Sequence, residues 1–211
     1  MLQLRLSNFN VAYHGIPAII DLSVTLTAAT VNLLTGMIGA GKTSLIRALS
    51  GAIGHSGGME LSEGLQTFDR NSILQPLPRS FVSRDMSVMQ FVQFGMIQNS
   101  WKLPHDAKER IHEALERSEL IAVAQSPISS LTPSQMRMLE LAQLFVQQPR
   151  VILLDEPSTQ LSSQSENSVL TCISKWVSDT QNIALVASDS SRAFTHVDRI
   201  LTLERGRLLS A

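Results

Sequence analysis

The chain has 211 residues, enough for one large domain or for one domain with an inserted subdomain. Its 17 basic and 18 acidic side chains leave a net charge of −1, so no overall basic field argues for nucleic acid as a partner. Hydrophobic residues make up 44% of the chain and charged residues only 17%. This balance predicts some apolar surface that a partner covers.

The first residues alternate like a strand and lack the continuous apolar core of a secretory signal. No run approaches the length of about eighteen apolar residues that a membrane-spanning helix needs. The single cysteine, Cys172, lies in an apolar helical pattern and is expected to be a buried thiol in a reducing compartment. We therefore expect a cytoplasmic protein that meets a membrane only through another chain.

The N-terminal segment predicts antiparallel strands. Residues 2–6 and 19–26 alternate between apolar and polar side chains, and the turn signal at 14–17 separates them. Tyr13, the only tyrosine, lies between the two runs. From its position alone, it is expected to be a half-buried aromatic of a strand.

Residues 36–44 read Gly-Met-Ile-Gly-Ala-Gly-Lys-Thr-Ser, which fits the phosphate-binding pattern of Gly, four residues and Gly-Lys-Thr. An apolar run at 30–34 predicts a buried strand before it, and residues 42–50 predict a helix after it. Glycines let successive N–H groups point at an anion, and the helix dipole adds positive charge there. The residues assigned to nucleotide binding on this basis are Gly36, Gly39, Ala40, Gly41, Lys42, Thr43 and Ser44.

Short strands are predicted at 59–61 and 72–74, and the second ends at Gln75. Helical patterns follow at 85–98, 104–118 and 133–147, which predict a helical insertion. Residues 81–101 are rich in Met and aromatic side chains. They could form a groove for a partner helix or the core of the insertion, and the sequence alone favours neither.

Thr132-Pro133-Ser134-Gln135 has the features of a helix start, with Thr132 as N-cap and Gln135 completing a capping box. Farther on, residues 151–154 and 183–187 are apolar runs typical of parallel strands buried on both faces. Asp155 and Glu156 follow the first run.

The second of these apolar runs ends in Ser188 and Asp189. The carboxyl ends of parallel strands form one edge of the sheet, where ligands bind. We therefore expect the glycine loop, Asp155-Glu156 and Ser188 to converge there. Asp155 is placed to bind Mg²⁺, and Glu156 to orient or deprotonate a water.

The order and spacing of these motifs resemble those of the ATP-binding cassette (ABC) ATPases over nearly the whole chain. The resemblance rests on the glycine loop, Gln75, Leu-Thr-Pro-Ser-Gln at 131–135, the run at 151–157, and an ending at 201–208 similar to the family's last strands. It implies an α/β fold of the P-loop NTPase kind. This fold would have a mainly parallel core sheet, an N-terminal antiparallel β subdomain and a helical insertion. Residues 1–211 would form one domain, with a nucleotide-binding core at 1–75 and 149–211 and a helical subdomain at 76–148.

The resemblance also implies roles for single residues. Tyr13 would stack on adenine, Glu156 would be the catalytic base beside Lys42, and Ser188 would hold the position of the family's switch histidine. Metal ligands would be Thr43, Gln75 and Asp155. In a head-to-tail dimer, the signature residues of one subunit would close over the nucleotide of the other; here these are Thr132, Ser134 and Gln135.

Three departures from the family pattern bear on activity. Pro133 has no N–H to offer a phosphate. Ser188 replaces the histidine, and neighbouring Asp189 has the wrong charge to substitute for it, while His196 lies eight residues farther on. Ser162 replaces an aspartate that makes a contact across the dimer. We therefore expect firm Mg-ATP binding with slow hydrolysis.

The leading hypothesis is an ATP-hydrolysing subunit that energises an ABC transporter, with ATP and Mg²⁺ as cofactors and transmembrane permease subunits and a second ATP-binding subunit as partners. It would lie at the inner face of the membrane. A bacterial importer is favoured, and a loose likeness at 75–95 suggests iron chelates or metal ions as cargo. The alternative is an ATP-gated module that dimerises with little or no hydrolysis. A small-molecule kinase with the same glycine loop would not explain why Gln75, the helix start at 131–135 and the run at 155–157 occur together.

Overall fold

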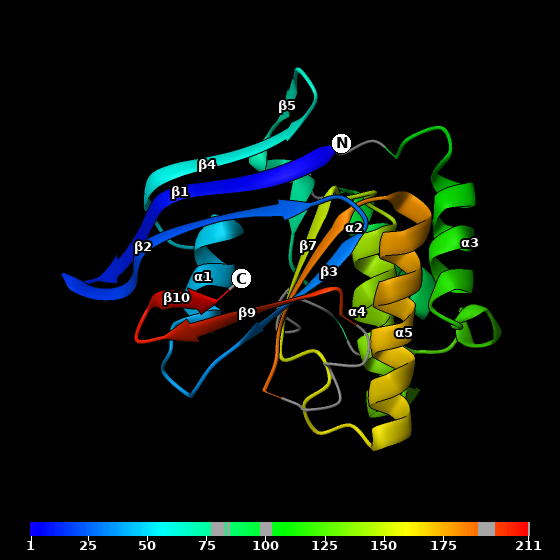
Figure 1. Ribbon diagram of the computed structural model, residues 1–211. Coiled ribbons are helices and arrows are strands. Elements are labelled where there is room, and N and C mark those ends of the chain that lie inside the picture. The colour runs from blue at the N-terminus through cyan, green and yellow to red at the C-terminus, as the bar shows by residue number, and fades with distance from the viewer. Residues whose placement is uncertain (77–82, 84, 98–102, 190–196, 211) are drawn as a thin grey trace.

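The computed structural model describes residues 1–76, 83, 85–97, 103–189 and 197–210. A four-stranded antiparallel sheet forms the upper left of the molecule in Figure 1, with strand order β2-β1-β4-β5. Its strands are β1 (Leu2–Tyr13), β2 (Ile16–Thr27), β4 (Ser56–Glu63) and β5 (Gln66–Phe68). Because β4 pairs with β1 on one side and β5 on the other, it is longer than the predicted strand at 59–61.

The second sheet has six strands in the order β10-β9-β3-β8-β7-β6. Its strands are β3 (Thr30–Thr35), β6 (Ile73–Leu74), β7 (Val151–Asp155), β8 (Ile183–Ala187), β9 (Arg199–Glu204) and β10 (Arg207–Ser210). All neighbouring pairs are parallel except β9 with β10. This arrangement confirms the predicted α/β fold with a mainly parallel core sheet beside an antiparallel one.

Both faces of the six-stranded sheet are buried, which explains the uninterrupted apolar runs of β7 and β8. Along β7, Val151 and Leu153 belong to a core shared with the antiparallel sheet and α1 (Lys42–Leu49). Ile152 and Leu154 point the other way, into a core shared with the remaining helices. The alternation follows from the period of two in a strand.

The helices of this second core are α2 (Val88–Ile97), α3 (Ala107–Arg117), α4 (Pro133–Phe145) and α5 (Ser163–Thr180), on the right in Figure 1. Short 3₁₀ turns lie at Arg70–Ser72, Ile121–Val123 and Ile128–Ser130. Helix α2 starts at Val88 rather than at residue 85 as predicted. None of the helices in the described part of the chain is long and apolar enough to cross a membrane.

The Met- and aromatic-rich stretch at 81–101 mainly packs inward. Phe91 is buried, and Met86, Met89 and Met96 are partly buried against the helical core, whereas Phe94 is exposed. Phe81 and Trp101 lie outside the described residues. The contacts of this stretch therefore favour the core of the helical insertion over an open partner groove.

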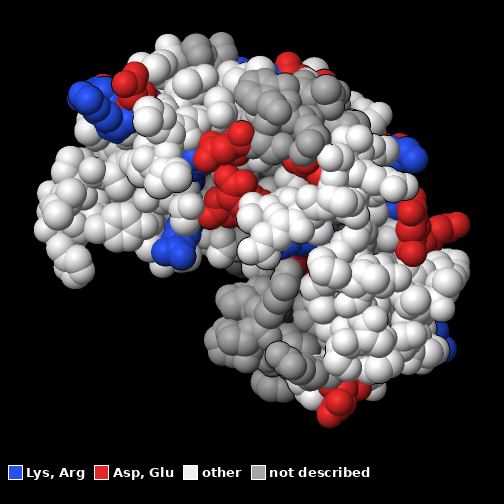
Figure 2. All heavy atoms as spheres, turned by 90° about the horizontal axis from the view of Figure 1, so that it is seen from below, with Lys and Arg blue, Asp and Glu red and all other residues white. Residues whose placement is uncertain are grey.

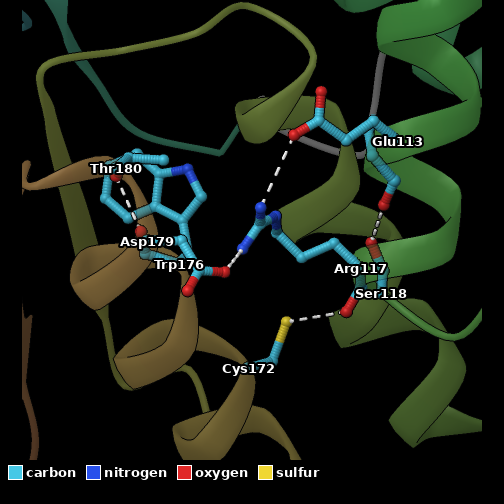
Figure 3. Close-up of polar contacts among 8 residues, drawn as sticks. Glu113, Arg117, Ser118, Cys172, Trp176, Asp179 and Thr180 are labelled. Atoms are coloured by element: carbon cyan, nitrogen blue, oxygen red, sulfur yellow. Dashed lines mark hydrogen bonds and ion pairs between the residues drawn. The ribbon is translucent and has the colours of Figure 1, made fainter.

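Polar contacts fasten α3 to α5 (Figure 3). The Arg117 guanidinium lies 2.6 Å from an Asp179 carboxylate oxygen and 3.5 Å from Glu113. The Cys172 thiol donates to the carbonyl oxygen of Arg117 at 3.5 Å. Cys172 is buried as predicted, and burial raises the pKa of its thiol to about 12, so it is a poor nucleophile.

Candidate functional site

The glycine loop connects β3 to α1, and its backbone explains its glycines. Gly36, Gly39 and Gly41 have φ values of 148°, 82° and 109°. Gly41 is the residue before the first helical residue, Lys42. Side chains other than glycine rarely adopt such angles, so the loop needs glycine at all three positions.

Two of these glycines differ in how much space surrounds them. A Cβ atom added at Gly36 would lie 2.2 Å from the Leu203 carbonyl oxygen, whereas one at Gly39 would meet nothing within 4 Å. We expect Gly36→Ala to lower the free energy of unfolding by about 2–3 kcal/mol, because β9 must shift. Gly39→Ala should cost roughly 1 kcal/mol from backbone strain alone. Urea denaturation of both variants checks this, and equal losses would contradict it.

The predicted convergence of functional residues follows from sheet order, since β3, β8 and β7 are neighbours. The Glu156 N–H donates to the Ala187 carbonyl oxygen at 2.9 Å, and the Ser188 N–H donates to the Leu34 carbonyl oxygen at 3.1 Å. The glycine loop, Asp155-Glu156 and Ser188-Asp189 are thus brought to the same end of the sheet. Figure 2 looks onto this end, where acidic side chains gather near the middle of the face beside a small basic area.

Lys42 is held by both the loop and the end of β8. Its ammonium group donates to the Gly36 carbonyl oxygen, and the Met37 carbonyl oxygen lies 3.4 Å away. The two carboxylate oxygens of Asp189 lie 2.9 and 3.0 Å from the same nitrogen. This contact was not predicted from the sequence, where Asp189 entered only as a possible substitute for a histidine. The available signal was its place just after the predicted strand at 183–187.

Glu156 has an unusual environment. Its φ of 50° places a residue other than glycine in the left-handed region, which is typical of functional positions. The Thr159 hydroxyl donates to its carboxylate at 3.2 Å. Burial, and next the negative charge of Asp189, raise the pKa of Glu156 above its ordinary value. A carboxylate with a raised pKa is a better proton acceptor, as a general base requires.

The residues expected to hold Mg²⁺ offer suitable oxygen atoms. Asp155 and Gln75 line one cavity of about 390 Å³, together with Arg137 and Glu140 of α4. Thr43 is exposed in the first turn of α1. Among the described residues, the charged groups that act on Glu156 are Asp189, Lys42 and Asp155, so carboxylates outnumber ammonium groups around it. This donor set and charge fit Mg²⁺, which binds to one or two carboxylates, waters and substrate phosphates.

The remaining loop residues have distinct environments. The Ala40 N–H donates to the Met37 carbonyl oxygen at 2.9 Å, so this amide is already used within the loop. Ser44 is half-buried in α1, one position after Thr43. Tyr13 is exposed rather than half-buried as expected from its position, because it is the last residue of β1, opposite Ile16 at the start of β2. Strand β2 also approaches the loop, since a Cβ at Gly41 would lie 2.6 Å from the Ala18 carbonyl oxygen.

The residues in the signature position start α4 with a complete capping box. The Gln135 N–H donates to the Thr132 hydroxyl at 3.2 Å, and the Thr132 N–H donates to the Gln135 side chain at 3.0 Å. Pro133 and Ser134 are the first two helical residues. The Thr132 hydroxyl is therefore engaged within its own helix.

Ser188 and Ser162, the two other departures from the family pattern, also take part in the packing and capping of the fold. Ser188 is only 1% exposed, at the end of β8. Ser162 is the N-cap of α5, and its hydroxyl accepts the Ser165 N–H at 3.3 Å. His196 lies outside the described residues.

The profile of one family, described as ABC transporter, matches residues 19–159, which is more than half of the chain. The chain belongs to the ABC transporter family, as an ATP-binding cassette. The hemin import ATP-binding protein HmuV of Rhodococcus jostii is 28% identical over 97% of this cassette and 73% of its own length. The putrescine transport ATP-binding protein PotG of Escherichia coli is 27% identical, and the match covers 98% of this cassette but 56% of PotG.

Solved structures agree on the fold. An ATP-binding cassette of an ABC transporter in its ADP conformation has a TM-score of 0.86 at 16% identity, and the match covers 100% of this chain and 90% of that one. CbiO1 of Clostridium perfringens, part of the transporter complex CbiONQ, has a TM-score of 0.85 at 22% identity, with 98% and 86% covered. These likenesses establish the cassette fold.

Proposed function

We propose that this cassette binds Mg-ATP at the glycine loop and hydrolyses it to energise an ABC transporter. The observation that carries the proposal is the convergence of Lys42, Asp155 and Glu156 at one end of the sheet. The glycine loop supplies N–H groups for phosphate oxygens, and Lys42 supplies positive charge for the terminal phosphates. The three parts together form a site for a charged phosphate chain and an attacking water.

Each residue has a proposed role in the reaction. Glu156 orients the attacking water and accepts its proton, because its carboxylate lies beside the loop and has a raised pKa. Thr43, Gln75 and Asp155 would hold Mg²⁺, which neutralises charge on the phosphates when it is bound. Tyr13 would contact the adenine ring from the hairpin that approaches Gly41.

We propose that this cassette hydrolyses ATP more slowly than is usual in its family. Pro133 cannot donate a backbone N–H, and the loss of one positioned donor costs about 10²–10³ in rate. The Thr132 hydroxyl already caps its own helix. Ser188 is buried and cannot supply the proton-transfer chemistry of an imidazole, a loss of about 10²–10⁴. Glu156 remains, so turnover should be reduced rather than absent.

The proposed partners are transmembrane permease subunits and a second ATP-binding subunit, with the cassette at the cytoplasmic face of the membrane. Met37 and Ile38 of the glycine loop are exposed apolar side chains beside the site, which suits a surface that a second subunit covers. The second subunit would place Thr132, Ser134 and Gln135 over the nucleotide. It could be a copy of this chain or a cassette with fewer substitutions.

Import is the proposed direction of transport, because several relatives carry names of import subunits. The hemin import protein favours an iron chelate as cargo, as the likeness at 75–95 suggests, while the phosphonates import protein PhnC 1 of Trichodesmium erythraeum is also 24% identical over 98% of the chain. The alternative function is an ATP-gated module that dimerises with little hydrolysis. The engaged Thr132 hydroxyl and the buried Ser188 favour it, whereas Glu156 speaks against it.

Nucleotide titration with Mg²⁺ present tests the proposed site. We expect saturable ATP binding by the wild-type cassette and at least a tenfold weaker affinity in Lys42→Ala, because the ammonium that meets the terminal phosphates is lost. Lys108→Ala removes an exposed lysine of α3 and is the matched control, with unchanged affinity expected. Absence of ATP binding by the wild type, or equal binding by Lys42→Ala, would contradict the proposal.

A further inference from the structure

The ammonium group of Lys42 has no donor left for a ligand. Lysine carries three N–H donors. Here the partners of these donors are the carbonyl oxygens of Gly36 and Met37 and the carboxylate of Asp189. The Lys42 side chain is 10% exposed, so water cannot easily replace a lost partner. A phosphate group that binds Lys42 must therefore displace one of these three.

Asp189 is the partner that can leave. Gly36 and Met37 are part of the loop that surrounds the ammonium, and their contacts come from the backbone. Asp189 reaches Lys42 from the end of β8, and its side chain is 47% exposed. Its carboxylate can turn into water, where a charge is well solvated, at little cost.

Asp189 also carries the charge that a phosphate would bring. A carboxylate and a phosphate are both oxygen anions that accept hydrogen bonds from an ammonium. The negative charge of Asp189 also acts on neighbouring Glu156, whose pKa it helps to raise. A bound phosphate chain and an ionised Asp189 would repel each other if both remained at Lys42.

We propose that Asp189 is an internal competitor for the terminal phosphates of the nucleotide: it holds Lys42 in the nucleotide-free cassette and must be displaced for binding. This inference rests on the proposed ATP site and adds a residue that sets its affinity and its selectivity. Only a nucleotide whose phosphate chain reaches Lys42 meets the competitor. Asp189 therefore weakens the binding of ATP and ADP and leaves that of AMP unchanged.

The first test measures the affinities of wild-type cassette and Asp189→Asn for ATP, ADP and AMP, with Mg²⁺ present. We expect ATP and ADP to bind Asp189→Asn about three- to tenfold more tightly than the wild type. This range corresponds to the loss of a partly exposed ion pair and of the repulsion between Asp189 and the phosphate chain. AMP should bind both proteins equally. Glu113→Gln also removes one carboxylate, on α3, and should leave all three affinities unchanged. If the wild type binds ATP, unchanged or weaker ATP binding by Asp189→Asn, or an equal gain for AMP, would overturn the inference.

The second test needs no nucleotide. An amine-selective acylating reagent is applied to both proteins, and the modification of Lys42 is measured by peptide mass spectrometry. We expect Lys42 to be modified several-fold faster in Asp189→Asn, because a neutral amide holds the ammonium less tightly than a carboxylate does, and Lys108 to react equally in both. Equal rates at Lys42 would overturn the inference. If neither protein binds ATP while Lys42 labelling rises, the contact is upheld and the proposed ATP site is what fails.

Discussion

Replacement of Glu156 by glutamine is expected to lower the rate of ATP hydrolysis by about 10²–10⁴-fold, the contribution of a positioned general base. The amide keeps the shape of the side chain but cannot accept a proton from water. Binding should survive, because Lys42, the loop amides and Asp155 are unchanged. Single-turnover hydrolysis with cassette in excess over ATP measures the chemical step, and a parallel nucleotide titration measures the affinity.

The matched control for this prediction is Glu109→Gln, which changes an exposed carboxylate of α3 in the same way. Its rate and affinity should equal those of the wild type. A Glu156→Gln variant that hydrolyses ATP at the wild-type rate would show that Glu156 is not the base. If the wild type hydrolyses ATP as slowly as Glu156→Gln does but still binds ATP, the result would instead favour the ATP-gated module.

The largest effect on stability is expected from Trp176→Ala, which should lower the free energy of unfolding by about 3–5 kcal/mol. Trp176 of α5 is 2% exposed and stacks on Phe145 of α4, with ring centroids 5.4 Å apart and planes 11° apart. Alanine removes this aromatic contact and leaves a cavity where α4 and α5 meet, which the surrounding helices can only partly fill. Urea denaturation followed by circular dichroism gives the loss directly.

Leu65→Ala is the control for this stability prediction, because it also removes a large apolar side chain but one that is fully exposed. Its effect should stay within about 0.5 kcal/mol. A loss of less than 1 kcal/mol in Trp176→Ala would mean that the helical core tolerates the cavity. The stack between α4 and α5 would then contribute little to holding the helical insertion on the sheet.

The amino-acid sequence by itself predicted the features that depend on neighbouring residues. The glycine loop at 36–44 has a local spacing that is diagnostic, and buried parallel strands such as β7 and β8 appear as apolar runs because both of their faces are covered. The capping box of α4 was predictable for the same reason, since Thr132 and Gln135 are three residues apart. Sheet order then placed the glycine loop and the ends of β7 and β8 at one edge.

Only the tertiary structure decided which distant side chains meet. Lys42 and Asp189 are 147 residues apart in the chain, and their contact arises because β8 lies beside β3 in the sheet. The shared cavity of Gln75 and Asp155 depends in the same way on the pairing of β6 with β7. A sequence pattern records the spacing of residues along one segment, whereas such contacts depend on strand order and packing, which no single segment specifies.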